Sequence, residues 1–120
     1  MAAYYIALAR HVPENWREVM RPYMDQVEAT VARYGGFYRT YLRHRVEVTE
    51  GDVGPHLGPT IVEFPSWEQL LAWYHSEEYA PLKALRQQNN RFDVMLVDGL
   101  TDAEIAENRR LVSLGEPGVP

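Results

Sequence analysis

The sequence predicts an α+β domain in which four strands form one antiparallel sheet and the helices cover one of its faces. Runs rich in β-branched and aromatic residues alternate with segments whose apolar residues recur every three to four positions. Their order is strand, helix, strand, strand, helix, strand, which is typical of this architecture. With 120 residues and 46% hydrophobic composition, the chain fits one domain with a single core.

The first strand is predicted at residues 4–12, because its side chains alternate between two faces. Ile6 and Leu8 share one face. The other face carries Tyr5, Ala7, Ala9 and His11. Three of these six residues are small or polar, so we expect Ile6 and Leu8 to point toward the helices.

A helix is predicted to follow the first strand, since apolar residues recur at helical spacing as far as Tyr34. Gly35 favours its end, because glycine readily takes the left-handed conformation that closes a helix. Pro22 lies inside the pattern and predicts a kink, since proline lacks the amide donor and crowds the preceding turn.

The second strand is predicted from Phe37 to about Val48. One face carries Tyr38, Thr40, Leu42, His44, Val46 and Val48. The opposite face carries Phe37, Arg39, Tyr41, Arg43, Arg45 and Glu47. A bulge would exchange these faces. Residues 51–59 are rich in Gly and Pro and predict a loop, and residues 60–64 form a short apolar run that predicts the third strand.

Ser66 and Gln69 have the spacing of a capping box and predict the start of the next helix. Its apolar stripe consists of Trp67, Leu70, Leu71 and Tyr74. Ser76 is followed by two glutamates, which predicts a second helix start because acidic residues suit the positive end of a helix. Residues 92–97 alternate again and predict the last strand.

The C-terminal residues predict an extension beyond a domain that spans residues 1–100. Thr101 and Glu104 have capping-box spacing, and apolar residues follow at intervals that suit a short amphipathic helix. We expect this helix to dock on the domain or on a partner subunit. Residues 116–120 are mostly Gly and Pro and predict a loose tail, so the extension comprises residues 101–120.

Composition excludes several classes of function. A formal net charge of -5 and a pI near 5.3 argue against nucleic-acid binding. The absence of cysteine removes disulfides and thiolate chemistry. No apolar run approaches the about 20 residues of a membrane span, so a cytoplasmic protein without membrane contact is expected. The four histidines lack metal-binding spacing, and no nucleotide or nucleophile motif is present, so neither metal nor organic cofactor is expected.

Five motifs together resemble the domain-of-unknown-function 1330 family, over roughly residues 4–99. They are Tyr34-Gly-Gly36, Glu50-Gly-Asp52, the run EFPSWEQLLAWYHSEEY from Glu63 to Tyr79, Leu85-Arg86 and Val97-Asp-Gly99. The resemblance implies a ferredoxin-like βαββαβ unit with strand order 4-1-3-2. It also implies a homodimer of the dimeric α/β-barrel superfamily, in which two sheets enclose a barrel.

In that implied topology, Glu63 is the leading catalytic candidate. The face opposite Val62 and Phe64 would point into the shared barrel. That face would carry Ala7, Ala9, His11, Ile61, Glu63, Arg39, Tyr41 and Arg43. A carboxylate in an apolar strand is costly to bury, and burial raises its pKa toward the range of a general base. The alternative is a structural ion pair between Glu63 and Arg39.

The other candidate residues have roles around that carboxylate. Arg39 and Arg43 would hold an anionic group or a developing enolate, unless they are solvated edge charges. Tyr41 or His11 would return the proton, and His44 would join them if a bulge shifted the register. The alternatives to these catalytic roles are that His11 is an ordinary surface histidine and His44 a hydrogen-bonded core histidine. Tyr5, Tyr38 and Trp73 would line an aromatic substrate pocket, although such stripes also form ordinary cores.

The resemblance implies an enzyme class without fixing a reaction. Our first hypothesis is a cofactor-independent acid/base enzyme, a cyclase or isomerase, acting on a small apolar or polyketide-like substrate in biosynthesis. The second is a non-catalytic dimeric accessory protein that binds a small ligand, since no motif has strong catalytic specificity. The third is a cofactor-free monooxygenase. The family usually has Arg-Gly-Gly where this chain has Tyr41-Leu42-Arg43, and Trp at Val53, which indicates a specialised pocket.

Overall fold

The computed structural model describes residues 1–41, 45–52 and 58–115, and it confirms the α+β fold. Its four strands are β1 (Ala3–His11), β2 (Phe37–Thr40), β3 (Thr60–Phe64) and β4 (Arg91–Asp98). They pair antiparallel in the order β2-β3-β1-β4, which is the predicted order of a ferredoxin-like sheet. The helices are α1 (Trp16–Val19), α2 (Arg21–Arg33), α3 (Trp67–Tyr74), α4 (Ala80–Asn89) and α5 (Asp102–Ser113).

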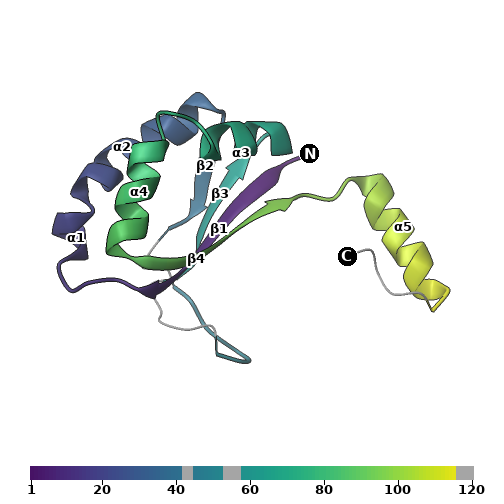
Figure 1. Ribbon diagram of the computed structural model, residues 1–120. Coiled ribbons are helices and arrows are strands. Elements are labelled where there is room, and N and C mark those ends of the chain that lie inside the picture. Colours follow the sequence, from purple (N-terminus) through teal and green to yellow (C-terminus); the bar gives the residue numbers. More distant parts are fainter. Residues whose placement is uncertain (42–44, 53–57, 116–120) are drawn as a thin grey trace.

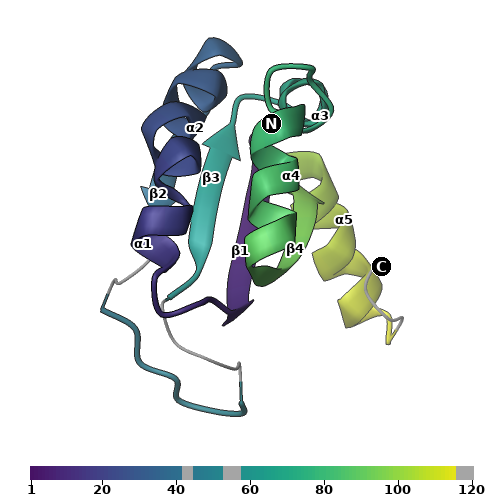
Figure 2. The same ribbon diagram turned by 60° about the vertical axis from the view of Figure 1, so that its left-hand side comes forward.

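Helices α1 to α4 cover one face of the sheet, and the other face is left open (Figures 1 and 2). The core lies between these two layers. Its largest fully buried side chains are Trp73, Tyr79, Phe64, Leu70, Val27, Val31 and Val62. The helices contribute most of these side chains, and β3 contributes two, because alternate residues of a strand point to the same layer.

The faces of β1 are the reverse of the prediction. Tyr5 pairs with Val62, and residues directly opposite each other in an antiparallel pair share a face. Tyr5 and Ala7 are therefore buried under the helices, whereas Ile6 pairs with Ile61 on the open face. Apolar side chains occupy both faces of β1, so side-chain size misled the prediction. We expected Ala7 and Ala9 to lie beside Glu63 on the open face, but both lie on the covered face.

Strand β2 ends at Thr40, eight residues earlier than predicted. Its register against β3 shifts between Tyr38 and Thr40, where a bulge was considered possible. This shift returns Tyr41 to the helix-covered side, together with Tyr38. Residues 42–44 lie outside the described residues, so the predictions for Arg43 and His44 have no structural counterpart.

Local sequence signals set most helix ends. Instead of a kink at Pro22, the structure has a break at Met20, between α1 and α2. Pro22 therefore lies in the first turn of α2, where its missing amide costs little. Gly35 has φ +76°, the left-handed conformation expected after a helix. The Ser66 Oγ accepts a hydrogen bond from the Gln69 amide at 3.1 Å, as its capping spacing predicted.

Helix α5 stands apart from the other helices. The capping box of Thr101 and Glu104 is confirmed, with both hydrogen bonds at 3.0 Å. None of the residues in α5 is buried. Figures 1 and 2 show α5 beyond β4, on the side away from α1, α2 and α4. Residues 116–120, expected to be a loose tail, lie outside the described residues.

Candidate ligand-binding site

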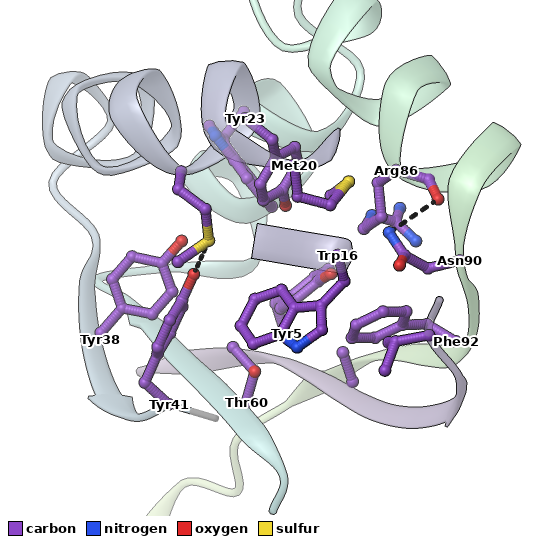
Figure 3. Close-up of a pocket in the computed structure, with 14 residues that line it drawn as sticks. Tyr5, Trp16, Met20, Tyr23, Tyr38, Tyr41, Thr60, Arg86, Asn90 and Phe92 are labelled. Atoms are coloured by element: carbon purple, nitrogen blue, oxygen red, sulfur yellow. Dashed lines mark hydrogen bonds between the residues drawn. The ribbon is translucent and has the colours of Figure 1, made fainter. Parts of the chain in front are cut away.

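A cavity lies between the helix layer and the covered face of the sheet (Figure 3). Every element from β1 to β4 contributes to its wall. The lining residues are Tyr5, Ala7, Val12, Trp16, Met20, Tyr23, Met24, Tyr38, Tyr41, Thr60, Trp73, Arg86, Asn90 and Phe92. Its volume is about 30 Å³, which is room for a few water molecules. Most of the wall is aromatic or thioether, so the cavity is chiefly apolar.

Trp73 fixes the inner wall of this cavity. Its indole Nε1 donates a hydrogen bond of 2.9 Å to the Thr30 hydroxyl, so its polar edge is satisfied away from the cavity. Tyr5 meets the indole edge-on, with ring centroids 5.5 Å apart. Tyr79 packs on it at 4.1 Å. These contacts lock the ring positions, and the wall is therefore pre-formed.

Phenol groups cluster around the cavity. The hydroxyls of Tyr23 and Tyr79 are hydrogen-bonded at 2.9 Å. Burial raises the pKa of Tyr5, Tyr23 and Tyr38 above the usual value. Burial also raises the pKa of Tyr41 to about 12. These phenols are therefore neutral at physiological pH and can donate hydrogen bonds to a ligand.

Tyr41 lies against Tyr38 and Met24, at the end of the cavity opposite Arg86 and Asn90 (Figure 3). Its ring meets that of Tyr38 edge-on, with centroids 5.1 Å apart. Its hydroxyl donates to the Met24 sulfur at 2.6 Å. A thioether is a weak acceptor and a flexible side chain, so this contact is easily exchanged for a better one.

Arg86 is the exceptional residue of the site. Its side chain is 5% exposed, yet Nε and Nη2 have no hydrogen-bond partner among the residues that the structure describes. Burial lowers the pKa of the guanidinium, but the surrounding phenols, above all that of Tyr5, raise it by more, and the net shift is upward. Arg86 therefore keeps its charge. Leaving charged donors unpaired in the interior costs about 1–3 kcal/mol or more.

Asn90 follows Arg86 by four residues and is the C-cap residue of α4. Its Nδ2 donates to the Arg86 carbonyl at 3.4 Å (Figure 3). Its Oδ1 is buried and has no partner within the described part of the chain. The C-terminal end of α4 and its C-cap thus present two donors and one acceptor that the described residues leave unsatisfied. Such groups are rare in native proteins and point to a ligand or ordered water.

Sequence reasoning did not single out Arg86 as a site residue, although Leu85-Arg86 was among the motifs of the resemblance. A usable signal was present. Leu82 and Arg86 are four residues apart, so they share one face of α4, and Leu82 belongs to the core. An arginine on the apolar stripe of an amphipathic helix must be either paired or functional. Asn90 continues the same stripe.

The predicted site residues separate into two groups on opposite faces of the sheet. The cavity brings together Tyr5, Tyr38, Tyr41 and Trp73. Glu63 lies on the open face, where Arg39 Nε donates to its Oε1 at 3.1 Å. The ion-pair interpretation of Glu63 therefore agrees with the geometry. His11 is exposed at the end of β1 and does not line the cavity.

Two further classes of site are not found. Within residues 1–41, 45–52 and 58–115, no group of three or more histidine and acidic side chains is placed to hold a metal ion. No helix in the same ranges is long and apolar enough to cross a bilayer. The cavity is the candidate site that the described geometry supports.

Comparisons with known proteins agree on the fold and leave the activity open. The family described as Domain of unknown function (DUF1330) matches residues 2–100. The chain is also similar to the crystal structure of a protein of unknown function from Rhodopseudomonas palustris, with a TM-score of 0.61 and 16% identity over 83% of each chain. At that identity the likeness shows the fold alone. No curated protein sequence matches the chain.

Proposed function

The chain belongs to this family of unknown function, and from that premise we propose that it binds a small, mostly apolar ligand in the cavity between helices and sheet. The observation that carries this proposal is Arg86, a buried cation whose Nε and Nη2 lack partners among the described residues. Evolution rarely keeps such a cost without a function. A group on the ligand that accepts hydrogen bonds would remove the cost.

The wall of the cavity suits an apolar body. Trp73, Tyr5 and Phe92 offer aromatic surface, which contributes most of the binding energy of small-molecule sites. A ligand larger than a few waters requires the wall to yield. Met20 and Met24 are the side chains best suited to this, since methionine is unbranched and repacks readily.

Fluorescence titration tests this proposal, because Trp16 and Trp73 both line the cavity. Benzoate, benzamide and phenol are suitable probes, and at least one should change the tryptophan emission saturably. Ala7→Leu should abolish that change by filling the cavity. Ala29→Leu makes the same substitution on the exposed side of α2 and should leave binding intact.

Circular dichroism must show that the Ala7→Leu protein is folded, and Thr60→Ile offers a second, milder way to reduce the cavity. The absence of saturable binding by any of the three probes to the wild-type protein would contradict the proposal. Binding that survives both cavity-filling substitutions in folded protein would place the site elsewhere.

A cofactor-independent acid/base enzyme, such as an isomerase or cyclase, is the second candidate. Neutral phenols beside a guanidinium are the groups that stabilise an enolate and return a proton. The described lining residues include no carboxylate or imidazole to act as base, which is why binding is placed first. Faster α-deuterium exchange of cyclohexanone, lost in Arg86→Met, would favour catalysis. Substrate-dependent oxygen consumption would favour the monooxygenase hypothesis.

We also propose that the protein forms a homodimer through the open face of the sheet. Met95, Ile6 and Ile61 form a row of apolar neighbours across that face, and Met95 is 49% exposed. A sheet face of this kind normally packs against another layer. A second copy would cover it and would enclose the ion pair of Glu63 and Arg39.

Helix α5 supports the same proposal. Isolated helices of about 12 residues are marginal in water, and α5 has no buried residue. Val112 of this helix is an exposed apolar side chain, and so are Leu100 just before the helix and Leu114 at its C-cap. A second copy would provide the surface on which this helix packs.

A further inference from the structure

The two unpaired donors of Arg86 have a definite geometry. Nε–H and one N–H of Nη2 lie on the same edge of the planar guanidinium and point in parallel directions. That edge matches the two oxygens of a carboxylate, which accepts both bonds side by side. A single hydroxyl or ketone oxygen would satisfy only one of the two donors well.

The surroundings favour a carboxylate over a phosphate. A bound phosphate carries up to two charges and several oxygens, all of which need donors when buried. The cavity is chiefly apolar, and Arg86 is the one cation among its described lining residues. A carboxylate has one charge, which one guanidinium neutralises, so the apolar remainder of the ligand can face Trp73 and Phe92.

Asn90 adds a second requirement. Its Nδ2 donates to the Arg86 carbonyl, which turns Oδ1 away from that bond and leaves it as an acceptor. A hydroxyl on the ligand would donate to it. Because the Asn90 side chain lies beside the Arg86 guanidinium in the cavity wall (Figure 3), such a hydroxyl must stand close to the carboxylate.

We infer that the natural ligand is a small apolar hydroxy acid, bound as its carboxylate to Arg86 with a neighbouring hydroxyl donating to Asn90. This inference rests on the proposed function, since it names the class of ligand for the same cavity. It identifies Arg86 as the anchor and Asn90 as the residue that selects hydroxy acids over plain acids.

Calorimetric titration with two matched pairs of probes tests the inference. The pairs are propionate with 2-hydroxypropionate and benzoate with 2-hydroxybenzoate, and the neutral controls are propionamide and benzamide. The wild-type protein should bind each acid about 10-fold or more tightly than its amide, since a charged, paired hydrogen bond is replaced by a neutral one. Each hydroxy acid should bind about fivefold more tightly than its parent.

Variants separate the two roles. Arg86→Met should lower the affinity for the acids about 10- to 100-fold and leave the amides nearly unchanged. Arg21→Met removes an exposed arginine from α2 and should change nothing. Asn90→Leu should remove only the preference for hydroxy acids. Asn89→Leu, at the adjacent position outside the cavity, should preserve it.

The folding of Arg86→Met gives an independent measurement. Because the substitution removes a buried charge with unpaired donors, the unliganded variant should melt at the same temperature as the wild type or higher. A clearly lower melting temperature would mean that Arg86 stabilises the fold itself, which would overturn its role as a ligand anchor.

The outcomes distinguish this inference from the proposed function. If the wild-type protein binds the amides as tightly as the acids, the carboxylate is overturned while ligand binding in the cavity stands. If the acids bind but hydroxy acids gain nothing, the role of Asn90 is overturned. If neither acids nor amides bind, the proposed function fails together with the inference.

Discussion

The two faces of the sheet hold their charges in opposite ways. On the open face, Arg39 and Glu63 satisfy each other at 3.1 Å, and the arginine side chain is 55% exposed. Under the helices, Arg86 is 5% exposed and two of its donors have no partner among the described residues. The first arrangement is complete without any ligand. The second is costly unless a ligand completes it.

This difference separates structural from functional charge. An exposed ion pair contributes little to stability and calls for no explanation. A buried guanidinium of which Nε and Nη2 lack partners among the described residues calls for a ligand. We therefore propose ligand binding on the covered face and assembly on the open face, and the following predictions test that division.

The largest expected effect concerns the core of the covered face. Trp73→Ala removes a side chain that is 1% exposed and should lower the free energy of unfolding by about 3–5 kcal/mol. Met95→Ala on the open face should lower it by about 1 kcal/mol or less. Urea unfolding of dilute protein measures both. Equal losses would mean that the open face is packed as tightly as the core.

The second-largest expected effect is a loss of folding stability at high pH, caused by the phenols of the covered face. Burial raises the pKa of Tyr41 from 10.0 to about 12, and it raises the pKa of Tyr5, Tyr23 and Tyr38 in the same direction. The folded state then holds these protons more tightly than the unfolded state. The stability due to Tyr41 is complete below pH 10 and is lost as the pH rises through about 12, whereas the contribution of the other three phenols is lost at higher pH.

Urea unfolding at a series of pH values between 8 and about 12 measures this dependence. Tyr41→Phe removes one of the titrating phenols and should make the decline less steep. Stability that stays constant across this interval would contradict the burial of the phenols.

Association should depend on the open face. Ile6→Lys places a charge in the apolar row of Ile61 and Met95. Each copy loses the burial of one isoleucine side chain, which contributes about 1.5 kcal/mol or more to association. The dissociation constant of the dimer should therefore rise about 100-fold or more. Light scattering across a dilution series reports the mass. A wild-type protein that is monomeric at all concentrations would contradict the proposed dimer.

The smallest expected effect concerns Glu63. In dilute, dissociated protein Glu63→Gln breaks a solvent-accessible pair with Arg39, so the free energy of unfolding should change by about 0.5 kcal/mol or less. Binding of benzoate in the cavity should not change. Loss of ligand binding or turnover in a folded Glu63→Gln protein would restore the hypothesis that Glu63 is the general base.

The sequence predicted the fold well because its signals are local. The β-branched run at residues 60–64, the capping pairs and Gly35 each have a direct physical cause, and the structure agrees with all of them. The faces of β1 were not predictable in this way. Ile6 and Leu8 are apolar because the open face is apolar too, so alternation alone could not identify the covered side.

The candidate site was predicted only in part, for two physical reasons. Tyr41 reaches the cavity because the register shifts after Tyr38, and a shift of one residue reverses every side chain that follows. Arg86 was overlooked because an arginine on a helix usually lies in solvent. Its position on the stripe of Leu82 was visible in the sequence, but the missing partners of its donors are visible only in three dimensions.

The most direct test of the division between the two faces is a crystal structure of the protein with 2-hydroxybenzoate bound. We predict the carboxylate oxygens about 2.7–2.9 Å from Nε and Nη2 of Arg86, with the hydroxyl donating to Asn90. A ligand bound instead on the open face beside Glu63 and Arg39 would contradict the account.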